Sequence, residues 1–313
     1  MENCIAVQGF RLCCLDPTPL FVQHWPLACT WTTLLTTLRD ISVIIPAHDE
    51  EAWLDRCMNS LMQQDDSARS VEIIVVANAC TDHTADIARG YGPAAERRGW
   101  ALRVIEVPQG GKLNALNLGD AAAQGRSRMY LDADITCDAD LLGQICTALS
   151  VDVPRYATGT LAIARARSWV TRCYASVWRR LPFVRGGAVG AGLFAVNPGG
   201  RQRWTAFPAI ISDDTFVRLQ FSAAERVEVP ARYHWPMVEG FGNLVRVRRR
   251  QDAGVTELRH RYPALFRNEA KAPLTIPGLL GIALRVPMGF LVYMAVHIAV
   301  RLRPATGEWT RGR

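Results

Sequence analysis

Between residues 41 and 131, short β-branched runs alternate with segments whose apolar residues recur at helical spacing. Four runs have the length and composition of strands: 41–45, 71–76, 102–107 and 127–131. Three segments between them indicate helices: 50–62, 81–89 and 112–123. Strands joined by helical crossovers pair in parallel and carry helices on both faces of the sheet. We therefore expect an α/β fold with a doubly wound, mainly parallel central sheet.

Two aspartates follow the fourth run, in the sequence YLDAD at residues 130–134. In an open α/β sheet, ligands bind beyond the carboxyl ends of the strands, so Asp132 and Asp134 are expected at the mouth of a site. They alternate on extended backbone and can take different roles, such as holding a ribose hydroxyl and a divalent cation. Oxygen ligands suit Mg²⁺ or Mn²⁺. Taken alone, the pattern is equally typical of a solvated loop or a helix cap.

Five motifs, in this order and spacing, resemble the family 2 glycosyltransferases, which have a nucleotide-sugar-binding GT-A fold. They are SVIIPAHDEE (42–51), VVANACTDHTADIA (75–88), GGKLNALNLG (110–119), YLDAD (130–134) and ISDDTFVRL (211–219). The resemblance runs from about residue 41 to about residue 254 and is to the bacterial membrane-associated type. It implies a GT-A-like sheet, a nucleotide-sugar donor and a divalent cation, Mg or Mn, as cofactor.

The chemistry of sugar transfer explains why carboxylates are needed. Breaking the anomeric bond builds negative charge on a diphosphate leaving group, and a bound cation stabilises that charge. The resemblance makes Asp134 the metal ligand, while Asp132 meets the ribose or shares the metal shell. Asp138 and Asp140 follow in the sequence TCDAD, and we expect them to cap the next helix.

The acceptor hydroxyl must lose a proton as it attacks, which requires a carboxylate on the face opposite the leaving nucleotide. Asp213 and Asp214 begin a helical pattern, and the resemblance matches Asp214 to the family's catalytic base, with Asp213 as its neighbour. The alternative is that both aspartates only cap a helix. A single base without a second, nucleophilic carboxylate implies single displacement and inversion at the anomeric carbon.

The resemblance also assigns residues to the nucleotide pocket. They follow the first two strands: Pro46, Ala47, His48, Glu50, Asn78 and Asp82. His48 is expected to stack or hydrogen-bond in the pocket rather than to bind metal. Ala77 stands where the family often has an aspartate that recognises the base. This departure removes the usual uridine contact or shifts it to backbone groups and Asn78.

Two basic residues complete the expected donor site. Lys112 lies in a Gly-Gly-Lys turn that opens a helix, so its ammonium and the backbone amides could face a phosphate; the alternative is a solvated lysine. Arg250 matches the arginine of a Gln-x-x-Arg-Trp motif of processive relatives and could clamp the diphosphate, the alternative being a solvated basic face. Val247 and Gln251 replace the Gln and Trp of that motif, which favours transfer of one sugar over polymerisation.

Beyond the aspartates, the sequence predicts a strand at 155–166 and an amphipathic helix at 168–180. The glycine-rich segment 186–197 fits a strand that approaches a bound sugar closely, or equally a buried core strand.

The C-terminal part differs in composition from the rest. The 313 residues carry a formal net charge of +7, and residues 241–313 alone hold 13 Lys and Arg against 4 Asp and Glu. The stretch 274–300 is apolar, with Arg285 as its only charged residue. A basic tail of this kind favours an anionic lipid surface over nucleic acid, which we do not expect as a partner. We expect a monotopic or re-entrant anchor; the alternative is a helix buried on the catalytic domain.

We therefore predict three parts: an irregular extension 1–39, a GT-A catalytic domain 40–260 and a basic, apolar membrane-associating helical segment 261–313. The catalytic domain comprises a nucleotide-binding half, 40–135, and an acceptor half, 136–260. The nine cysteines form no C-x-x-C pair, which indicates reduced, cytosolic thiols. Residues 1–39 lack a basic start and a cleavage site, so no signal peptide is expected.

These observations predict an inverting enzyme that moves one sugar from a nucleotide-sugar donor to a lipid-linked or glycan acceptor. Its expected place is the cytoplasmic face of a membrane, in the synthesis of cell-envelope polysaccharide or glycolipid. One alternative is a sugar nucleotidyltransferase, although the glycine-rich, Arg- and Lys-bearing signature of that class is missing after the first strand. Another is a catalytically decayed, membrane-bound binding protein, which only Ala77 and the altered arginine motif support.

Overall fold

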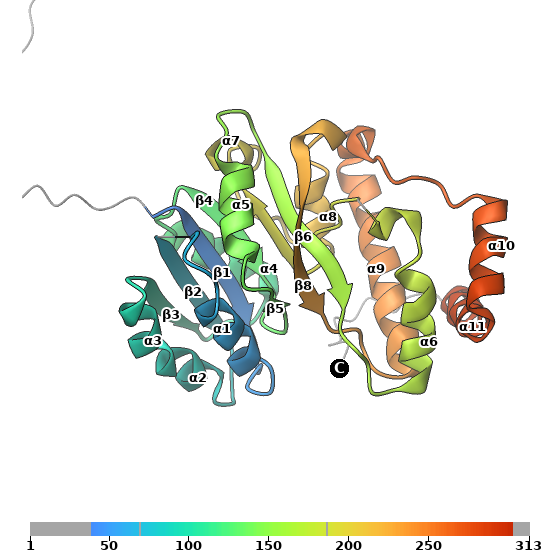
Figure 1. The fold of residues 1–313 in the computed structure, drawn as a ribbon, viewed down its shortest axis with the longest axis horizontal. Coiled ribbons are helices and arrows are strands. Elements are labelled where there is room, and N and C mark those ends of the chain that lie inside the picture. Colours follow the sequence, from blue (N-terminus) through green and yellow to red (C-terminus); the bar gives the residue numbers. More distant parts are fainter. Residues whose placement is uncertain (1–38, 69, 186, 303–313) are drawn as a thin grey trace, which may run out of the picture. The chain divides into compact units, whose positions relative to one another are not determined.

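The computed structural model describes residues 39–68, 70–185 and 187–302. Its single sheet has eight strands in the order β3-β2-β1-β4-β7-β6-β8-β5 (Figure 1). The strands are β1 (Ile41–Ala47), β2 (Val71–Asn78), β3 (Ala101–Val107), β4 (Ser127–Leu131), β5 (Thr136–Cys137), β6 (Tyr156–Ile163), β7 (Leu193–Val196) and β8 (Arg226–Trp235). The extension 1–38 and the last residues of the C-terminal segment lie outside the described residues.

Helices follow most strands. They are α1 (Leu54–Met62), α2 (Thr84–Gly90), α3 (Gly92–Arg97), α4 (Lys112–Ala122), α5 (Leu141–Leu149), α6 (Trp169–Trp178), α7 (Pro198–Arg201), α8 (Asp213–Arg218), α9 (Phe241–Arg261), α10 (Ile276–Arg285) and α11 (Pro287–Leu302). Short 3₁₀ turns lie at Pro182–Val184, Ala223–Glu225 and Pro263–Asn268. The four strands and three helices predicted up to residue 131 are all present, although the first helix begins at Leu54 rather than at Glu50.

The first half of the sheet is parallel and the second half is mixed. Strands β3, β2, β1 and β4 pair in parallel, which confirms the βαβ prediction for this half. Strand β7 then lies antiparallel between β4 and β6, while β6 pairs in parallel with β8. The expected α/β class with a largely parallel sheet is therefore confirmed, and the strand predicted at 155–166 is observed as β6.

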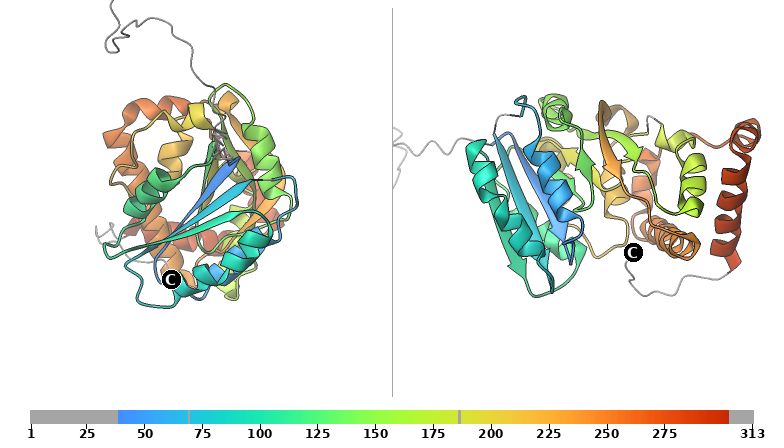
Figure 2. Two further views of the ribbon diagram at one scale, coloured as in Figure 1. Left: turned by 90° about the vertical axis from the view of Figure 1, so that its left-hand side faces the viewer. Right: turned by 60° about the horizontal axis from the view of Figure 1, so that its bottom comes forward.

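Helices cover both faces of this sheet, as expected for a doubly wound arrangement (Figure 2). Alternate residues of β1 show the division, because Val43 and Ile45 belong to one buried cluster and Ile44 to another. The first cluster includes side chains of α1 and α5, such as Leu54 and Leu141. The second receives side chains of α4, α8 and α9. A third apolar cluster joins α6 and α9 to α10 and α11.

The glycine-rich segment 186–197 is a strand only from Leu193. Gly190 and Gly192 precede it with φ angles of +63° and +73°, a region that side chains other than glycine rarely adopt. An added Cβ at Gly192 would lie 3.2 Å from Oδ2 of Asp132. The segment therefore turns sharply beside the aspartates, and the prediction of a strand across the whole of it was wrong.

Candidate active site

Strands β1, β2 and β4 are parallel neighbours, so their carboxyl ends lie along one edge of the sheet. His48 and Asp132 directly follow β1 and β4, and Asn78 is the last residue of β2. Three segments that are far apart in the sequence therefore meet at this edge, as expected of a ligand site in an α/β sheet.

Asp132 and Asp134 lie in a turn between β4 and β5. Both are half-buried, whereas Ala133 and Ile135 between and after them are buried in the core. The backbone N–H of Asp132 donates to the carbonyl of Gly192 at 2.8 Å, which fixes the start of the turn. The two carboxylates thus lie in one turn and are each partly accessible, and their oxygen atoms are suitable donors for a hard divalent cation.

Lys112 is the first residue of α4, directly after Gly111, whose φ of +133° shapes the turn. Its Nζ lies 2.8 Å from Oδ1 of Asp132 and 3.0 Å from Oδ2 of Asp213. Removal from water lowers the pKa of the ammonium, but the two carboxylates more than offset this effect and raise it above its usual range. Lys112 therefore joins the aspartate turn to the second predicted carboxylate pair, and the prediction of a solvated lysine does not describe it.

Asp213 and Asp214 are the first two residues of α8. Asp213 is only 6% exposed, and Asp214 is half-buried. Burial raises the pKa of Asp214, and the neighbouring charge of Asp213 raises it further, while Lys112 acts in the opposite direction. A carboxylate with a raised pKa is a stronger base than an exposed aspartate.

Asn78 is 2% exposed, and both ends of its amide are used within the protein. Its Nδ2 donates to the carbonyl of Ala47 at 2.6 Å, and its Oδ1 accepts from the N–H of Gly111 at 3.0 Å. The side chain therefore ties the end of β1 to the turn that presents Lys112. It positions the site, and direct recognition of a base by this amide does not fit these contacts.

The other residues predicted for the nucleotide pocket surround the same edge. Pro46 and Ala47 are buried at the end of β1, and His48 is half-buried directly after them. The N–H of Glu50 donates to Oγ1 of Thr84 at 2.7 Å. Asp82 accepts hydrogen bonds from the N–H groups of Glu51 and Thr84 and from the hydroxyl of Thr84. Burial raises the pKa of Asp82, but these hydrogen bonds lower it by more.

One group of potential metal ligands was not predicted from the sequence. One ligand atom each from His48, Asp49 and Cys80 lies within 4.8 Å of the other two. Asp49 and Ala79 have φ angles of +48° and +50°, which bring the loops after β1 and β2 together. Both loops belong to motifs quoted above, but their pairing depends on these unusual backbone conformations, which the sequence pattern does not indicate.

The arginine cluster at 246–250 lies inside α9, and its members have different contacts. Arg248 forms an ion pair with Asp252 at 3.2 Å, and Arg249 donates to the carbonyls of Ala299 and Val300. Arg250 precedes Gly254 by one helical turn, and Gly254 packs against Ser212. Arg250 thus lies on the face of α9 that is directed towards the start of α8, so its assignment to the diphosphate stays a prediction.

Asp138 and Asp140 were expected to cap α5, and their side chains do not. Asp140 occupies the N-cap position, but its carboxylate accepts no hydrogen bond from a backbone N–H at the helix start. Instead it accepts a hydrogen bond from Gln144, four residues later. Asp138 pairs with Nε2 of His234 on β8 at 2.8 Å. The competing side-chain partners explain why the capping prediction was wrong.

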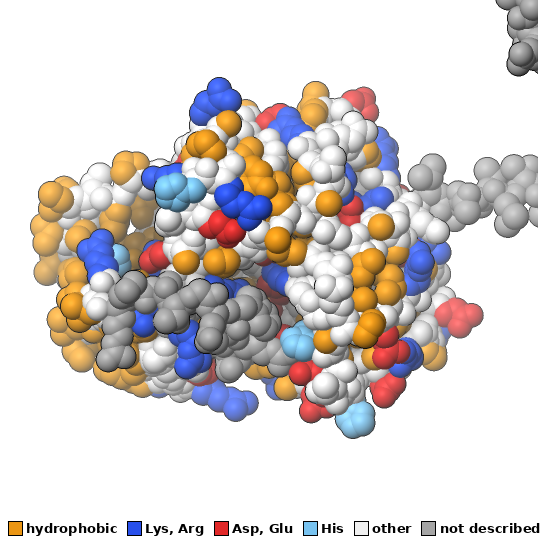
Figure 3. Space-filling model, turned by 180° about the vertical axis from the view of Figure 1, so that it is seen from behind, with side chains coloured by type: hydrophobic (Ala, Val, Ile, Leu, Met, Phe, Trp, Pro, Cys, Tyr) orange, Lys and Arg blue, Asp and Glu red, His pale blue; other side chains and the backbone are white. Residues whose placement is uncertain are grey.

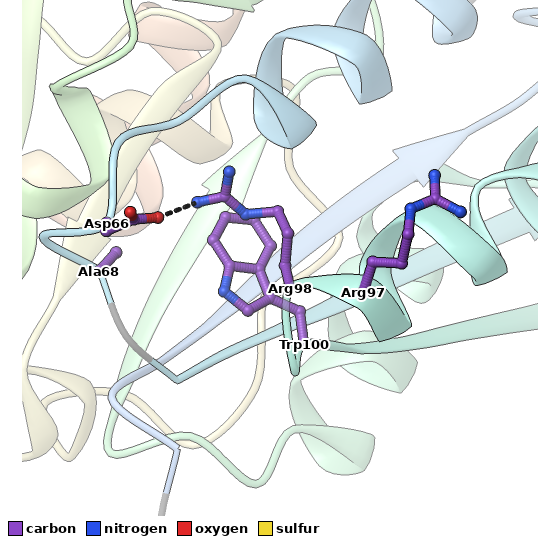
Figure 4. A pocket seen from close by; sticks show the side chains of 5 residues that line it. All are labelled: Asp66, Ala68, Arg97, Arg98 and Trp100. Atoms are coloured by element: carbon purple, nitrogen blue, oxygen red, sulfur yellow. Dashed lines mark ion pairs between the residues drawn. The ribbon is translucent and has the colours of Figure 1, made fainter.

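A separate pocket lies at the opposite, amino-terminal edge of β2 and β3 (Figure 4). The guanidinium of Arg98 lies over the ring of Trp100 at 4.3 Å and pairs with Asp66 at 3.6 Å. Arg98 also donates to the carbonyls of Met62 and Asp65. These contacts hold the loop after α1 on the protein, and the predicted site residues lie at the other edge of the sheet.

The chain has relatives of known class that agree with this arrangement. Residues 42–186 match glycosyl transferase family 2. The uncharacterized glycosyltransferase EpsJ of Bacillus subtilis (strain 168) is 33% identical over 94 residues, which are 30% of this chain and 26% of that protein. The dolichyl-phosphate beta-glucosyltransferase of Drosophila melanogaster is 35% identical over 104 residues, 30% of this chain and 31% of that protein. Residues 42–186 of this chain are therefore similar to glycosyl transferase family 2.

A solved structure agrees on the fold. The mannosyltransferase PcManGT from Pyrobaculum calidifontis, in complex with GDP-Man and Mn²⁺, has a TM-score of 0.54 with this chain at 19% identity. The likeness covers 87% of this chain and 77% of that one, and it shows the GT-A fold expected from the sequence. The chain spans about a quarter to a third of the length of the curated relatives that it matches.

Proposed function

We propose that the protein transfers a single sugar from a nucleotide-sugar donor to an acceptor, with inversion at the anomeric carbon. The observation that carries this proposal is the pair of contacts from Lys112 to Asp132 and Asp213. These contacts bring the predicted donor-side carboxylates and the predicted base-side carboxylates to one place on the sheet edge. One site could therefore both bind the leaving diphosphate and take the proton of the acceptor hydroxyl.

The donor side fits a nucleotide diphosphate with a divalent cation. Asp132 and Asp134 offer oxygen donors from one half-buried turn and would hold Mg²⁺ or Mn²⁺. Such an ion supplies positive charge to the diphosphate when it is bound. The complex of PcManGT with GDP-Man and Mn²⁺ supports this part of the proposal. Lys112, Arg250 and the loops after β1 and β2 are the further groups proposed to contact the donor.

The acceptor side requires a base, and we assign this role to Asp214. Its carboxylate takes the proton of the acceptor hydroxyl as the hydroxyl oxygen forms a bond to the anomeric carbon. The bond from that carbon to the diphosphate oxygen breaks, and the nucleoside diphosphate leaves with the electron pair. The raised pKa of Asp214 supports this role, because proton transfer to a more basic carboxylate is more favourable. Asp213, paired with Lys112, holds the base in a fixed environment.

We further propose a lipid-linked or glycan acceptor and a peripheral or monotopic position at the cytoplasmic face of a membrane. The relative named for dolichyl phosphate supports a lipid-linked acceptor. Among the described residues, no helix is both long enough and apolar enough to cross a bilayer. Two alternatives have less support: a sugar nucleotidyltransferase and a decayed binding protein. The reason is that Lys112 lies between Asp132 and Asp213, which belong to the two carboxylate pairs proposed for the transfer reaction.

The test is a donor panel of UDP, GDP and dTDP sugars with Mn²⁺, Mg²⁺ or a chelator. We expect one donor to be hydrolysed slowly without an acceptor, and the released sugar to have the anomeric configuration opposite to that of the donor by NMR. Release of pyrophosphate from a nucleoside triphosphate and a sugar phosphate would instead identify a nucleotidyltransferase. Absence of turnover together with normal donor binding would favour the decayed protein.

A further inference from the structure

Large apolar side chains are exposed on α10 and α11 far more than elsewhere. Eight of the thirteen exposed large hydrophobic residues of the described chain lie between residues 274 and 302. On α10 they follow helical spacing, and Leu284 is 84% exposed. Figure 3 shows apolar side chains gathered over this end of the molecule. We call seven of them the outer face: Ile276, Leu280, Leu284, Met288, Leu291, Ile298 and Leu302.

The opposite side of these helices is packed against the protein. Val296 and Ile282 are buried in the cluster that joins α10 and α11 to α6 and α9. Tyr293 stacks on Tyr174 of α6 with ring centroids 5.2 Å apart. An added Cβ at Gly289 would lie 2.8 Å from the carbonyl oxygen of Cys173, so α11 packs closely on α6.

The end of α11 is fixed as well. Arg249 of α9 donates to the carbonyl of Ala299 at 2.5 Å, which satisfies a backbone group of the last turn. The outer face is therefore presented by helices that are held in place on their other side. A helix with one side buried in protein can contact lipid only on the remaining side, as interfacial helices do.

The residues around the outer face carry positive charge, which favours an anionic partner. Residues 270–302 contain no Asp or Glu, while Lys271, Arg285 and Arg301 lie before, between and at the end of the two helices. Pairing of two copies through this face would bring basic residues towards basic residues. An anionic lipid surface offers opposite charge at its headgroups and an apolar layer below them.

We propose that the outer face of α10 and α11 docks the protein on an anionic membrane, with its apolar side chains inserted below the headgroups and Arg285 and Arg301 paired with lipid phosphates. This inference deepens the membrane position within the proposed function by naming the surface and its lipid partner. Its deciding measurement, binding to vesicles, uses no sugar donor, so its failure is distinguishable from failure of the transfer reaction.

The experiment is co-sedimentation of the full chain with vesicles of pure phosphatidylcholine or of phosphatidylcholine with phosphatidylglycerol. We expect binding to the anionic vesicles that exceeds binding to the neutral ones. The double substitution Leu280→Glu with Leu284→Glu is expected to lower the partition constant at least about tenfold, since it removes insertion and adds repulsion. Arg285→Gln and Arg301→Gln are each expected to lower it by about fivefold.

Val153→Glu is the matched control, because Val153 is an exposed apolar residue in the loop after α5. It should bind vesicles as the unchanged protein does. The double variant should keep its melting temperature and its donor hydrolysis in the absence of vesicles, and Asp214→Asn should still bind vesicles. Equal binding of the double variant and the control would overturn the proposal. So would a dimer in light scattering that the double substitution converts to a monomer, because a second copy would then cover this face.

Discussion

The ammonium of Lys112 lies 3.0 Å from Oδ2 of Asp213, and the same nitrogen lies 2.8 Å from Oδ1 of Asp132. A residue at the start of α4 thus connects the turn after β4 with the start of α8. Asp213 is buried enough that a lost partner would leave its charge poorly compensated. Lys112 therefore sets the electrostatic balance of the site and the separation of its two carboxylate pairs.

Substitution Lys112→Gln is expected to lower turnover at least about tenfold and to raise the KM for the donor, because both ion pairs are lost together with a positive charge proposed to contact the donor. We expect a loss in unfolding free energy on the order of 1 kcal/mol, since Lys112 is partly exposed to water. Steady-state kinetics and urea unfolding measure both effects. Arg89→Gln, which breaks an exposed pair with Glu106, serves as the control and should change neither. Normal kinetics of Lys112→Gln would leave this residue without a role in donor binding or turnover.

Substitution Asp214→Asn is expected to lower kcat by about 10²-fold or more with little change in donor affinity, the usual scale for losing a general base. The amide keeps the shape of the side chain but cannot accept the proton. Because the folded state raises the pKa of Asp214, its ionised form opposes folding at neutral pH. The variant should therefore be as stable as the unchanged protein or more so at pH 7. Asp140→Asn, at an exposed N-cap position, is the control, and equal rates for both variants would identify Asp214 as a helix-start residue only.

The pH profile gives an independent test of the same base. The proposed base Asp214 can accept a proton only when it is ionised, so we expect kcat/KM to fall as the pH decreases through its raised pKa. The acidic limb is expected above the ordinary aspartate range. Lys112 lowers the pKa of Asp214 and Asp213 raises it. Lys112→Gln should therefore move the limb to higher pH, and Asp213→Asn should move it to lower pH. A limb that stays in place in both variants would assign it to another group.

Substitution Asp134→Ala is expected to abolish transfer and the part of nucleotide binding that depends on metal. Asp134 is half-buried in a turn outside the strands and helices, so the fold should survive with a loss in unfolding free energy on the order of 1 kcal/mol. Titration with Mn²⁺ and a nucleoside diphosphate measures the first effect, and thermal unfolding measures the second. Asp138→Ala is the control from the same segment, since its carboxylate pairs with His234. Mn²⁺-dependent binding that persists in Asp134→Ala would remove this residue from the metal site.

Much of the fold was predictable because its signals are local. The β-branched run from Ile41 and the helical spacing from Lys112 each lie within one element, and both elements appear at the expected place. The reversal of β7 was not predictable in this way. It is defined by the antiparallel pairing of β7 with β4 and β6, which are distant from it in the sequence.

In the candidate site, too, single residues were predictable from local motifs, but contacts between distant segments were not. The motifs identified Asp132, Lys112 and Asp213, but not the ion pairs among them, because side-chain pairing depends on how β4, α4 and α8 pack. Arg249 is a further example. Its neighbours in the sequence indicate only a basic face, whereas the structure uses it to bind the end of α11.

The amide of Asn78 provides the last prediction, because it joins the carbonyl of Ala47 to the N–H of Gly111 in a buried position. Substitution Asn78→Ala leaves both backbone groups without this partner, so we expect a loss of about 1–3 kcal/mol in unfolding free energy. The turn before Lys112 would also lose its anchor, so donor KM should rise while Mn²⁺ affinity stays unchanged.

Urea unfolding and steady-state kinetics measure these effects. Asn243→Ala is the matched control, since its exposed amide donates to the carbonyl of Glu239 and its loss should cost no more than about 0.5 kcal/mol. If Asn78→Ala unfolded like this control but lost donor binding entirely, the amide would contact the nucleotide directly. The positioning role derived from its two backbone bonds would then have to be abandoned.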